Sequence, residues 1–140
     1  MAELTKFTPT FKAEFEQLAK DRKEDFEALR KQGRWTASVY LGPYIVEARL
    51  KFKICQTLKL EQLPAILKVH DLNALLIYAG LLDELKALPT VFDNFGKVND
   101  IHEKTAWRYK VANPLDQATS DKLEEWLFNP NDGVMTWLGL

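Results

Sequence analysis

The sequence predicts an all-α fold, an antiparallel up-and-down bundle of about five helices that forms one domain over residues 1–140. Apolar residues recur every three or four positions along most of the chain, which is the spacing of one helix face. No segment alternates β-branched and polar residues over the length of a strand. Hydrophobic residues make up 46% of the 140 positions, which is enough for one buried core.

A first helix is predicted over residues 9–32. Thr8 can cap it, and Pro9 occupies the first helical position, where a missing N–H costs nothing. Lysines and glutamates on the opposite face are expected to stay solvated, and Gly33 closes the helix. The apolar stripe consists of Phe11, Phe15, Leu18, Ala19, Phe26 and Leu29.

A long second helix is predicted over residues 36–58. Pro43 lies inside it, removes one backbone hydrogen bond and crowds the preceding turn. Because the apolar spacing continues on both sides of Pro43, a kink near residues 39–43 is expected rather than a helix end. Gly42 leaves room for a neighbouring helix to approach. The stripe consists of Val39, Pro43, Val46, Leu50, Ile54 and Leu58.

Three more helical regions and a final helical turn are predicted after the connection of residues 59–69, which contains Pro64. Gly80 ends the first of these regions in a left-handed conformation, and Pro89 breaks the second. Residues 107–115 are expected to form a loop. The helical regions are residues 71–79, 83–103, 116–128 and, after a turn at 129–133, residues 134–138.

The single cysteine, Cys55, rules out a disulfide within one chain and lies in an apolar helical stretch, where it is expected to be a small buried hydrophobe. A reducing compartment and a cytoplasmic location are therefore expected. The first residues, MAELTKFTPTF, lack the apolar segment of a signal peptide. No run approaches the roughly 18 apolar residues of a membrane span.

Charge and motifs exclude several function classes. The formal net charge is −1 and the pI is about 6.1, so the basic excess typical of a nucleic-acid-binding surface is missing. Any such contact is expected to be local or to act through a partner. The six glycines form no phosphate-binding loop. Because CxxC, HExxH and GxSxG patterns are also absent, neither a metal nor a cofactor is expected.

Several segments, taken in order, resemble the HEPN domain, a helical domain associated with nucleotide binding in prokaryotes and higher eukaryotes. Residues 40–51, YLGPYIVEARLK, are similar to the long second helix of that family. The resemblance extends over about residues 35–138 and implies the same helical bundle. The other matching segments are HDLNALL at 70–76, AGL at 79–81, WRY at 107–109, residues 121–127 and WL at 137–138.

Two departures from the family pattern affect the functional prediction. Pro43 interrupts a helix that is unbroken in the family. The ribonuclease members also carry an arginine followed four to six residues later by a histidine. The only histidines here are His70 and His102, and neither follows an arginine at that spacing. The ribonuclease activity of the family is therefore not carried over.

The resemblance implies a non-catalytic module that acts through a protein or nucleic-acid partner. A small nucleotidyltransferase, as in toxin–antitoxin pairs, is the partner that the family implies, and RNA is the other. The module is expected to be a homodimer formed through its first and second helices, with Glu47, Arg49 and Trp107 as contacts. Glu47 can pair with Lys51 at i,i+4 or with Arg49 of a neighbouring chain. It is expected to be a partly solvated helix charge, and a buried, partnered Glu47 that specifies a dimer is the alternative.

An alternative prediction is a divergent, metal-independent ribonuclease. Such chemistry needs a base near the 2′-hydroxyl and a cation for the developing phosphorane charge. His102, Arg108 and Tyr109 are the one grouping that offers both within a short segment. The favoured interpretation is structural: Arg108 pairs with a carboxylate, Tyr109 and Trp107 pack on the end of the bundle, and His102 is solvated. A third hypothesis is a helical packing protein that binds no ligand.

The pair His70–Asp71 invites comparison with a metal site. Two adjacent residues at a helix start, without further histidine or cysteine ligands nearby, make a poor metal site. Asp71 as a helix N-cap explains the pair better. The four tryptophans are expected to fill the core and a subunit interface.

Overall fold

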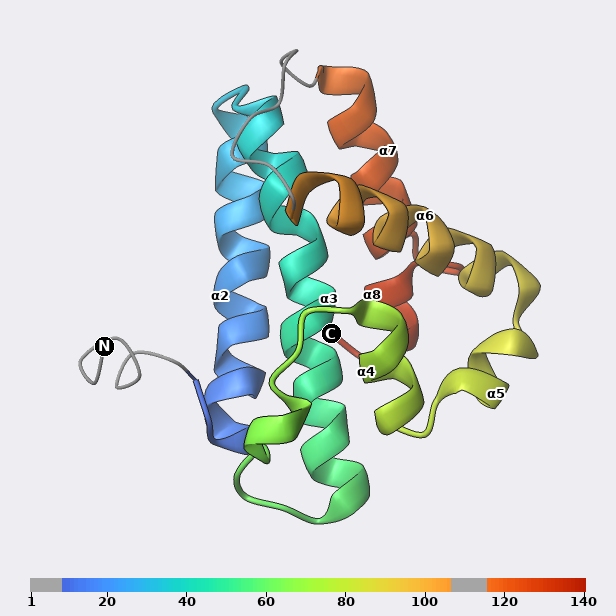
Figure 1. The fold of residues 1–140 in the computed structure, drawn as a ribbon. Coiled ribbons are helices and arrows are strands. Elements are labelled where there is room, and N and C mark those ends of the chain that lie inside the picture. Colours follow the sequence, from blue (N-terminus) through green and yellow to red (C-terminus); the bar gives the residue numbers. More distant parts are fainter. Residues whose placement is uncertain (1–8, 107–115) are drawn as a thin grey trace.

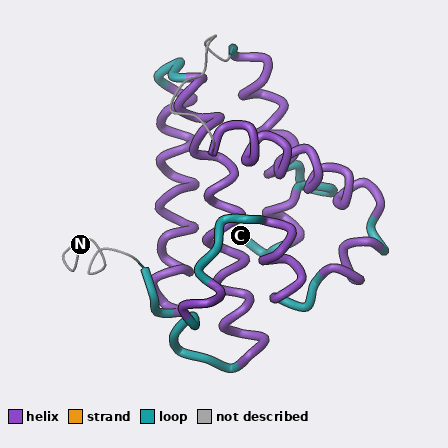
Figure 2. Tube along the Cα trace, viewed as in Figure 1, coloured by secondary structure: helices purple, strands orange, loops and turns teal. Residues whose placement is uncertain are grey.

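The computed structural model describes residues 9–106 and 116–140, without the side chains of residues 105 and 106, and confirms the all-α prediction. The described residues contain seven α-helices and one 3-10 turn, and their sole β-type pairing is an isolated bridge between Phe11 and Gln62. Figure 2 shows this helical content along the described part of the trace. The elements are α2 Lys12–Lys31, α3 Trp35–Leu58, η1 Ala65–Leu67, α4 Leu72–Tyr78, α5 Leu82–Lys86, α6 Pro89–Ala106, α7 Gln117–Phe128 and α8 Val134–Trp137.

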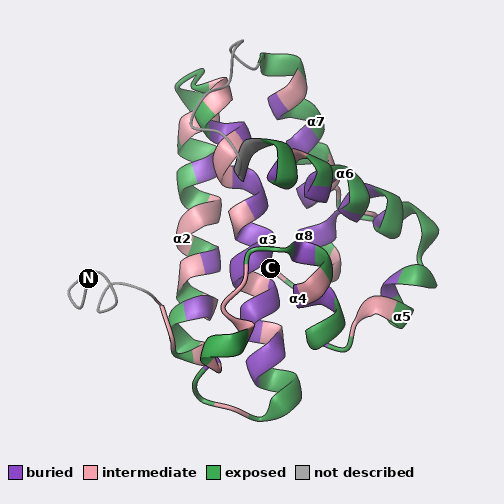
Figure 3. Ribbon diagram, in the orientation of Figure 1, coloured by how far each residue is buried: buried purple, intermediate pink, exposed green. Residues whose placement is uncertain are grey.

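Helix α3 forms the centre of the bundle. It lies antiparallel to α2 along most of its length, after a reversal at Gly33, whose φ is 69° (Figure 1). It also contacts α4, α6, α7 and α8. In Figure 1 the up-and-down order holds for α2 and α3, whereas α6 crosses α3. Because neighbours surround α3, more than half of its residues are buried (Figure 3).

Pro43 lies inside α3 without ending it, as the apolar spacing predicts. The prediction of room at Gly42 is also confirmed. A Cβ atom built on Gly42 would lie 2.6 Å from Cδ2 of Leu123 and 3.3 Å from Cδ1 of Leu127. Helix α7 therefore packs directly on the backbone of α3 at this glycine. Of the predicted stripe, only Leu58, in the last turn, is exposed.

Local signals define most helix ends. The Asp71 side chain accepts hydrogen bonds from the N–H groups of Asn73 and Ala74 and caps α4, as predicted. Gly80 follows α4 with a φ of 74°, and Pro89 begins α6 after the break that separates it from α5. Residues 107–115, predicted as a loop, lie outside the described residues.

The first helix begins later than predicted, at Lys12 instead of Pro9. Its N-terminal residues are held in an extended conformation by the connection after α3. The carbonyl of Thr10 accepts a hydrogen bond from the N–H of Leu63 at 2.8 Å, and the N–H of Lys12 donates to the carbonyl of Glu61 at 2.8 Å. Thr8, the predicted cap, lies outside the described residues.

Cys55 is fully buried in α3, as predicted. Burial raises the pKa of its thiol above the ordinary value. Within the described ranges, none of the helices is both long and apolar enough to cross a bilayer.

Candidate functional site

Helix α3 carries a buried carboxylate, Glu47, which is 8% exposed. The expectation of a partly solvated charge was wrong. A helix stripe predicts one covered face, but α3 is covered on several sides. Glu47 follows the stripe residue Val46. It faces α2 on one side and the segment before α4 on another. Glu47 therefore needs partners that replace its lost hydration.

Three side chains from three parts of the chain surround the Glu47 carboxylate. Lys51, one turn further along α3, places Nζ 3.4 Å from Oε2, as the i,i+4 spacing predicts. His70, just before α4, places Nδ1 2.9 Å from Oε1. His102, near the end of α6, places Nε2 3.4 Å from the same oxygen. The carboxylate thus connects α3, the segment before α4, and α6.

The partners keep Glu47 ionised. Burial alone would raise the pKa of Glu47, but the contacts with His102, Lys51 and His70 outweigh burial and lower the pKa below its ordinary value of 4.5. A carboxylate can only accept hydrogen bonds, so the proton of His70 lies on Nδ1. In the neutral ring, Nε2 then carries the free lone pair.

The two histidines play different parts. His102 is 2% exposed, which corrects the expectation of a solvated side chain. Its Nε2–H points to the backbone carbonyl of His70 at 3.1 Å, and its ring meets Tyr44 edge-on at 4.9 Å between centroids. The side chain of His70, by contrast, is 74% exposed. His102 therefore holds Glu47 and the backbone of His70 in place from within the protein, whereas the side chain of His70 is accessible to solvent.

Of the three predicted catalytic residues, His102 is the one within the described part of the chain. Arg108 and Tyr109, together with the predicted contact residue Trp107, lie outside the described residues. The histidine that sequence reasoning set aside, His70, is the accessible one. The one that it selected, His102, lies within the protein.

A cavity of about 440 Å³ opens beside this cluster, between α2, α3 and the segment of residues 68–70. Its volume falls within the usual range of small-ligand sites. Arg22, Lys51 and Lys68 line it together with the carboxylate of Glu47. Arg22 pairs with Asp25 and Lys51 with Glu47, whereas Nζ of Lys68 donates to the hydroxyl of Thr10 at 2.9 Å and faces no carboxylate among the described residues. The apolar lining residues are Pro9, Phe15, Leu18, Leu41, Tyr44 and Ala48.

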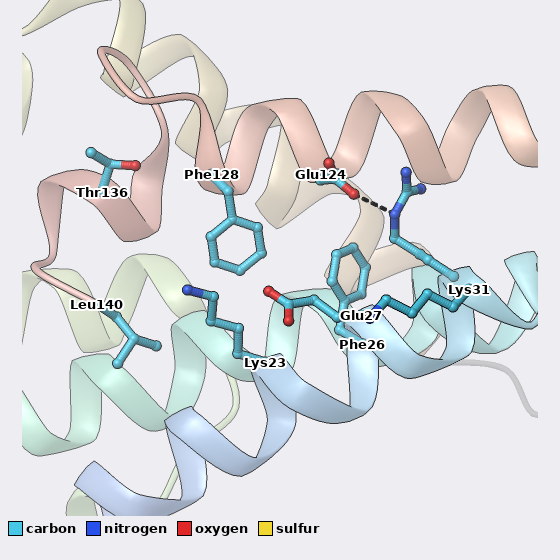
Figure 4. A pocket seen from close by; sticks show the side chains of 9 residues that line it. Lys23, Phe26, Glu27, Lys31, Glu124, Phe128, Thr136 and Leu140 are labelled. Atoms are coloured by element: carbon cyan, nitrogen blue, oxygen red, sulfur yellow. Dashed lines mark ion pairs between the residues drawn. The ribbon is translucent and has the colours of Figure 1, made fainter.

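A larger hollow of about 520 Å³ lies between α2, α7 and the C-terminal residues (Figure 4). Arg30, one of its lining cations, forms ion pairs with Asp121 at 2.9 Å and with Glu124, and Nζ of Lys23 lies 5.0 Å from the ring centroid of Phe128. The rings of Phe26 and Phe128 form its apolar part. This hollow holds no buried titratable cluster and is explained by the packing of α7 on α2.

Arg49, predicted as a contact with another chain, is engaged within its own chain. Its Nε and Nη2 groups donate to the carbonyls of Leu138 and Gly139, each at 3.1 Å. The guanidinium lies 4.7 Å from the ring centroid of Phe52. Arg49 therefore holds the C-terminal turn against α3.

The Glu47 cluster has the composition of an acid–base or anion-binding site. Across residues 9–106 and 116–140, no three His, Cys, Asp or Glu side chains are placed to hold a metal ion. The arrangement offers a carboxylate-oriented imidazole, Nε2 of His70, with nearby ammonium and guanidinium groups. Such groups bind phosphate or carboxylate and can transfer protons.

No family model matches the sequence, and no curated protein or solved structure matches it. The resemblance to the HEPN domain therefore depends on the motifs quoted above.

Proposed function

We propose that this chain is a HEPN-like helical module that binds a phosphate-bearing ligand, a nucleotide or a nucleotide unit of an RNA partner, in the cavity beside α2 and α3. The observation that carries the proposal is the buried, ionised Glu47, which holds Lys51 and His70 at the cavity. Buried charge clusters with shifted pKa values concentrate at functional sites.

The cavity matches the two parts of a nucleotide. Lys51, Lys68 and Arg22 offer cations to a phosphate group. Leu41 and Tyr44 belong to the apolar lining that can accept the flat face of a base. The overall charge of −1 provides no general attraction for nucleic acid, so recognition has to come from this local group of cations.

The proposal retains a homodimer and a protein partner such as a nucleotidyltransferase. Helix α3 contacts five helices of its own chain, so little of it is left for another subunit. The outer face of α2 is the part of the proposed interface that stays open. A solution mass of about twice 16.2 kDa, measured by light scattering, is expected, and the mass of one chain would contradict the dimer.

Binding can be measured by calorimetry with adenosine 5′-monophosphate and with a short single-stranded oligoribonucleotide. Lys68→Ser is expected to weaken binding about tenfold, the effect of about 1.4 kcal/mol from one phosphate contact. For the oligoribonucleotide, the slope of the logarithm of the binding constant against the logarithm of the salt concentration should fall by about one unit in Lys68→Ser.

Lys20→Ser is the matched control, because Lys20 is an exposed lysine of α2 paired with Glu16 at 3.7 Å, away from the cavity. Its affinity should equal that of the unmodified protein. Adenosine, which lacks the phosphate, should bind much more weakly. Equal binding of adenosine and its monophosphate, or an unchanged affinity in Lys68→Ser, would refute the proposal.

A further inference from the structure

We propose that His70 accepts a phosphoryl group on Nε2 from a small acyl phosphate bound in the cavity beside Glu47. The inference rests on the proposed function, because it uses the same phosphate-binding cavity. It adds a covalent modification site and the chemical class of its donor.

The first argument is the orientation of the nucleophile. The contact of 2.9 Å between Nδ1 of His70 and Oε1 of Glu47 keeps the proton on Nδ1 and leaves the lone pair on Nε2. Glu47 cannot turn away easily, because Lys51 and His102 hold it from other sides. A histidine oriented by a second group is the usual form of an activated imidazole.

The second argument is access. Both histidines approach the same oxygen of Glu47, but His102 is buried, whereas the side chain of His70 is 74% exposed. Since Nδ1 faces the buried carboxylate, the exposed part of the ring is the side that carries Nε2. His102 is therefore a positioning residue, and His70 is the group that a donor can reach.

The third argument is charge. A phosphoryl group carries about two negative charges and three acceptor oxygens. Lys51, Lys68 and Arg22 line the cavity at which His70 lies. The neighbouring carboxylate, Asp71, accepts hydrogen bonds from N–H groups of α4. Arg22 is paired with Asp25 and Lys51 with Glu47, whereas Lys68 donates, among the described residues, only to the hydroxyl of Thr10, so Lys68 is the lining cation that favours an incoming phosphate most.

The chemical step is balanced without a metal or a redox partner. The Nε2 lone pair forms the N–P bond while the P–O bond to the acyl group breaks. The acyl carboxylate leaves with that electron pair and needs no proton. The ring keeps the proton on Nδ1, and the Glu47 carboxylate stabilises the resulting positive charge.

The test uses the full chain and acetyl phosphate, with intact mass spectrometry to follow the label. The unmodified protein should gain one phosphoryl group that is labile in acid and stable in base, as N-phosphates are, and peptide mapping should place it on His70. His70→Gln should gain none, and because this side chain is exposed the variant should fold, which circular dichroism can verify.

Glu47→Gln should slow labelling about 10–100-fold, the usual effect of removing an orienting partner. Lys68→Ser should also slow labelling, although it leaves Glu47 unchanged. Inorganic phosphate should compete with the acetyl phosphate donor. Glu16→Gln, an exposed glutamate of α2 away from the cavity, is the control and should label at the unmodified rate.

Label that persists in His70→Gln, or labelling of the folded protein no faster than in urea, would overturn the inference. If the protein binds adenosine 5′-monophosphate but takes no label, the inference fails and the proposed function stands. If it neither binds nor labels, both fail.

Discussion

Replacing Glu47 by glutamine is expected to lower the free energy of unfolding by about 2–4 kcal/mol at pH 7. Removing one partner of a buried ion pair costs about 3–5 kcal/mol, because the other charge stays buried without compensation. Lys51 is that charge, since its side chain is only 10% exposed and its Nζ faces Glu47. The expected loss is smaller than that of a fully buried ion pair because another partner of Glu47, His70, is largely exposed and keeps most of its hydration. Glutamine has nearly the same volume, so no cavity adds to the loss.

Urea denaturation measures this change. With a slope of about 2 kcal/mol/M for urea, the midpoint should fall by about 1–2 M while the slope stays constant. The loss should also depend on pH. Because the pKa of Glu47 is lowered in the folded protein, its ionisation stabilises the fold above pH 4.5, the ordinary value. The difference between the two proteins should shrink as the pH falls below 4.5 and through the folded pKa.

Two further variants separate the ion pair from a general effect of mutation. Glu16→Gln removes an exposed pair with Lys20 and should change stability by less than about 0.5 kcal/mol. Lys51→Met combined with Glu47→Gln should cost less than the sum of the single changes, because no unpaired buried cation remains. A Glu47→Gln midpoint equal to that of the Glu16→Gln control, or a difference that persists unchanged in acid, would refute the argument for a buried carboxylate.

Three more predictions concern α3 and α6. Gly42→Ala should destabilise the protein, because overpacking against the fully buried Leu123 costs about 1–3 kcal/mol and exceeds the helix-propensity gain of about 1 kcal/mol. Gly96→Ala in α6 should stabilise the protein by up to about 1 kcal/mol, because no atom lies within 4 Å of the added Cβ. The urea midpoints of the two variants should therefore shift in opposite directions, and shifts in the same direction would contradict the packing argument. Cys55 should react with a thiol reagent far more slowly in the folded protein than in urea, because burial raises its pKa and blocks access, and equal rates would contradict its burial.

Most of the fold could be predicted because its helix ends are set by local chemistry. Asp71 and Asp116 both accept hydrogen bonds from backbone N–H groups in the first turn of a helix, and both positions were predicted as helix starts. Pro89 separates two helices in the region where a break was predicted. The beginning of α2 was missed because its cause is not local: residues 10–12 bond to the connection after α3, and periodicity does not report such a contact.

The candidate site was only partly predictable. The i,i+4 pair of Glu47 and Lys51 follows from the sequence and is confirmed. The approach of His102 to Glu47 depends on how α6 crosses α3, and that of His70 depends on how the segment before α4 lies against α3. A linear pattern specifies neither. His70 was interpreted through its neighbour Asp71, whereas its partner Glu47 lies in α3. The sequence did contain a useful signal. Glu47 is an acidic residue in the most apolar predicted helix and therefore needs partners, and the two histidines of the chain are candidates.

The physical cost of Glu47 is the strongest argument that the cluster has a function. A leucine at this position would fill the same space in α3 without any loss of hydration, and replacing buried ion pairs by apolar residues is often neutral or stabilising. The ion pair with Lys51 is therefore a poor explanation if stability is the only purpose. The exposed His70 also adds little to the core, yet its ring is oriented by the carboxylate. An accessible, oriented imidazole at a cavity lined by Arg22, Lys51 and Lys68 suits the proposed phosphate ligand, whose binding would return stability through mass action.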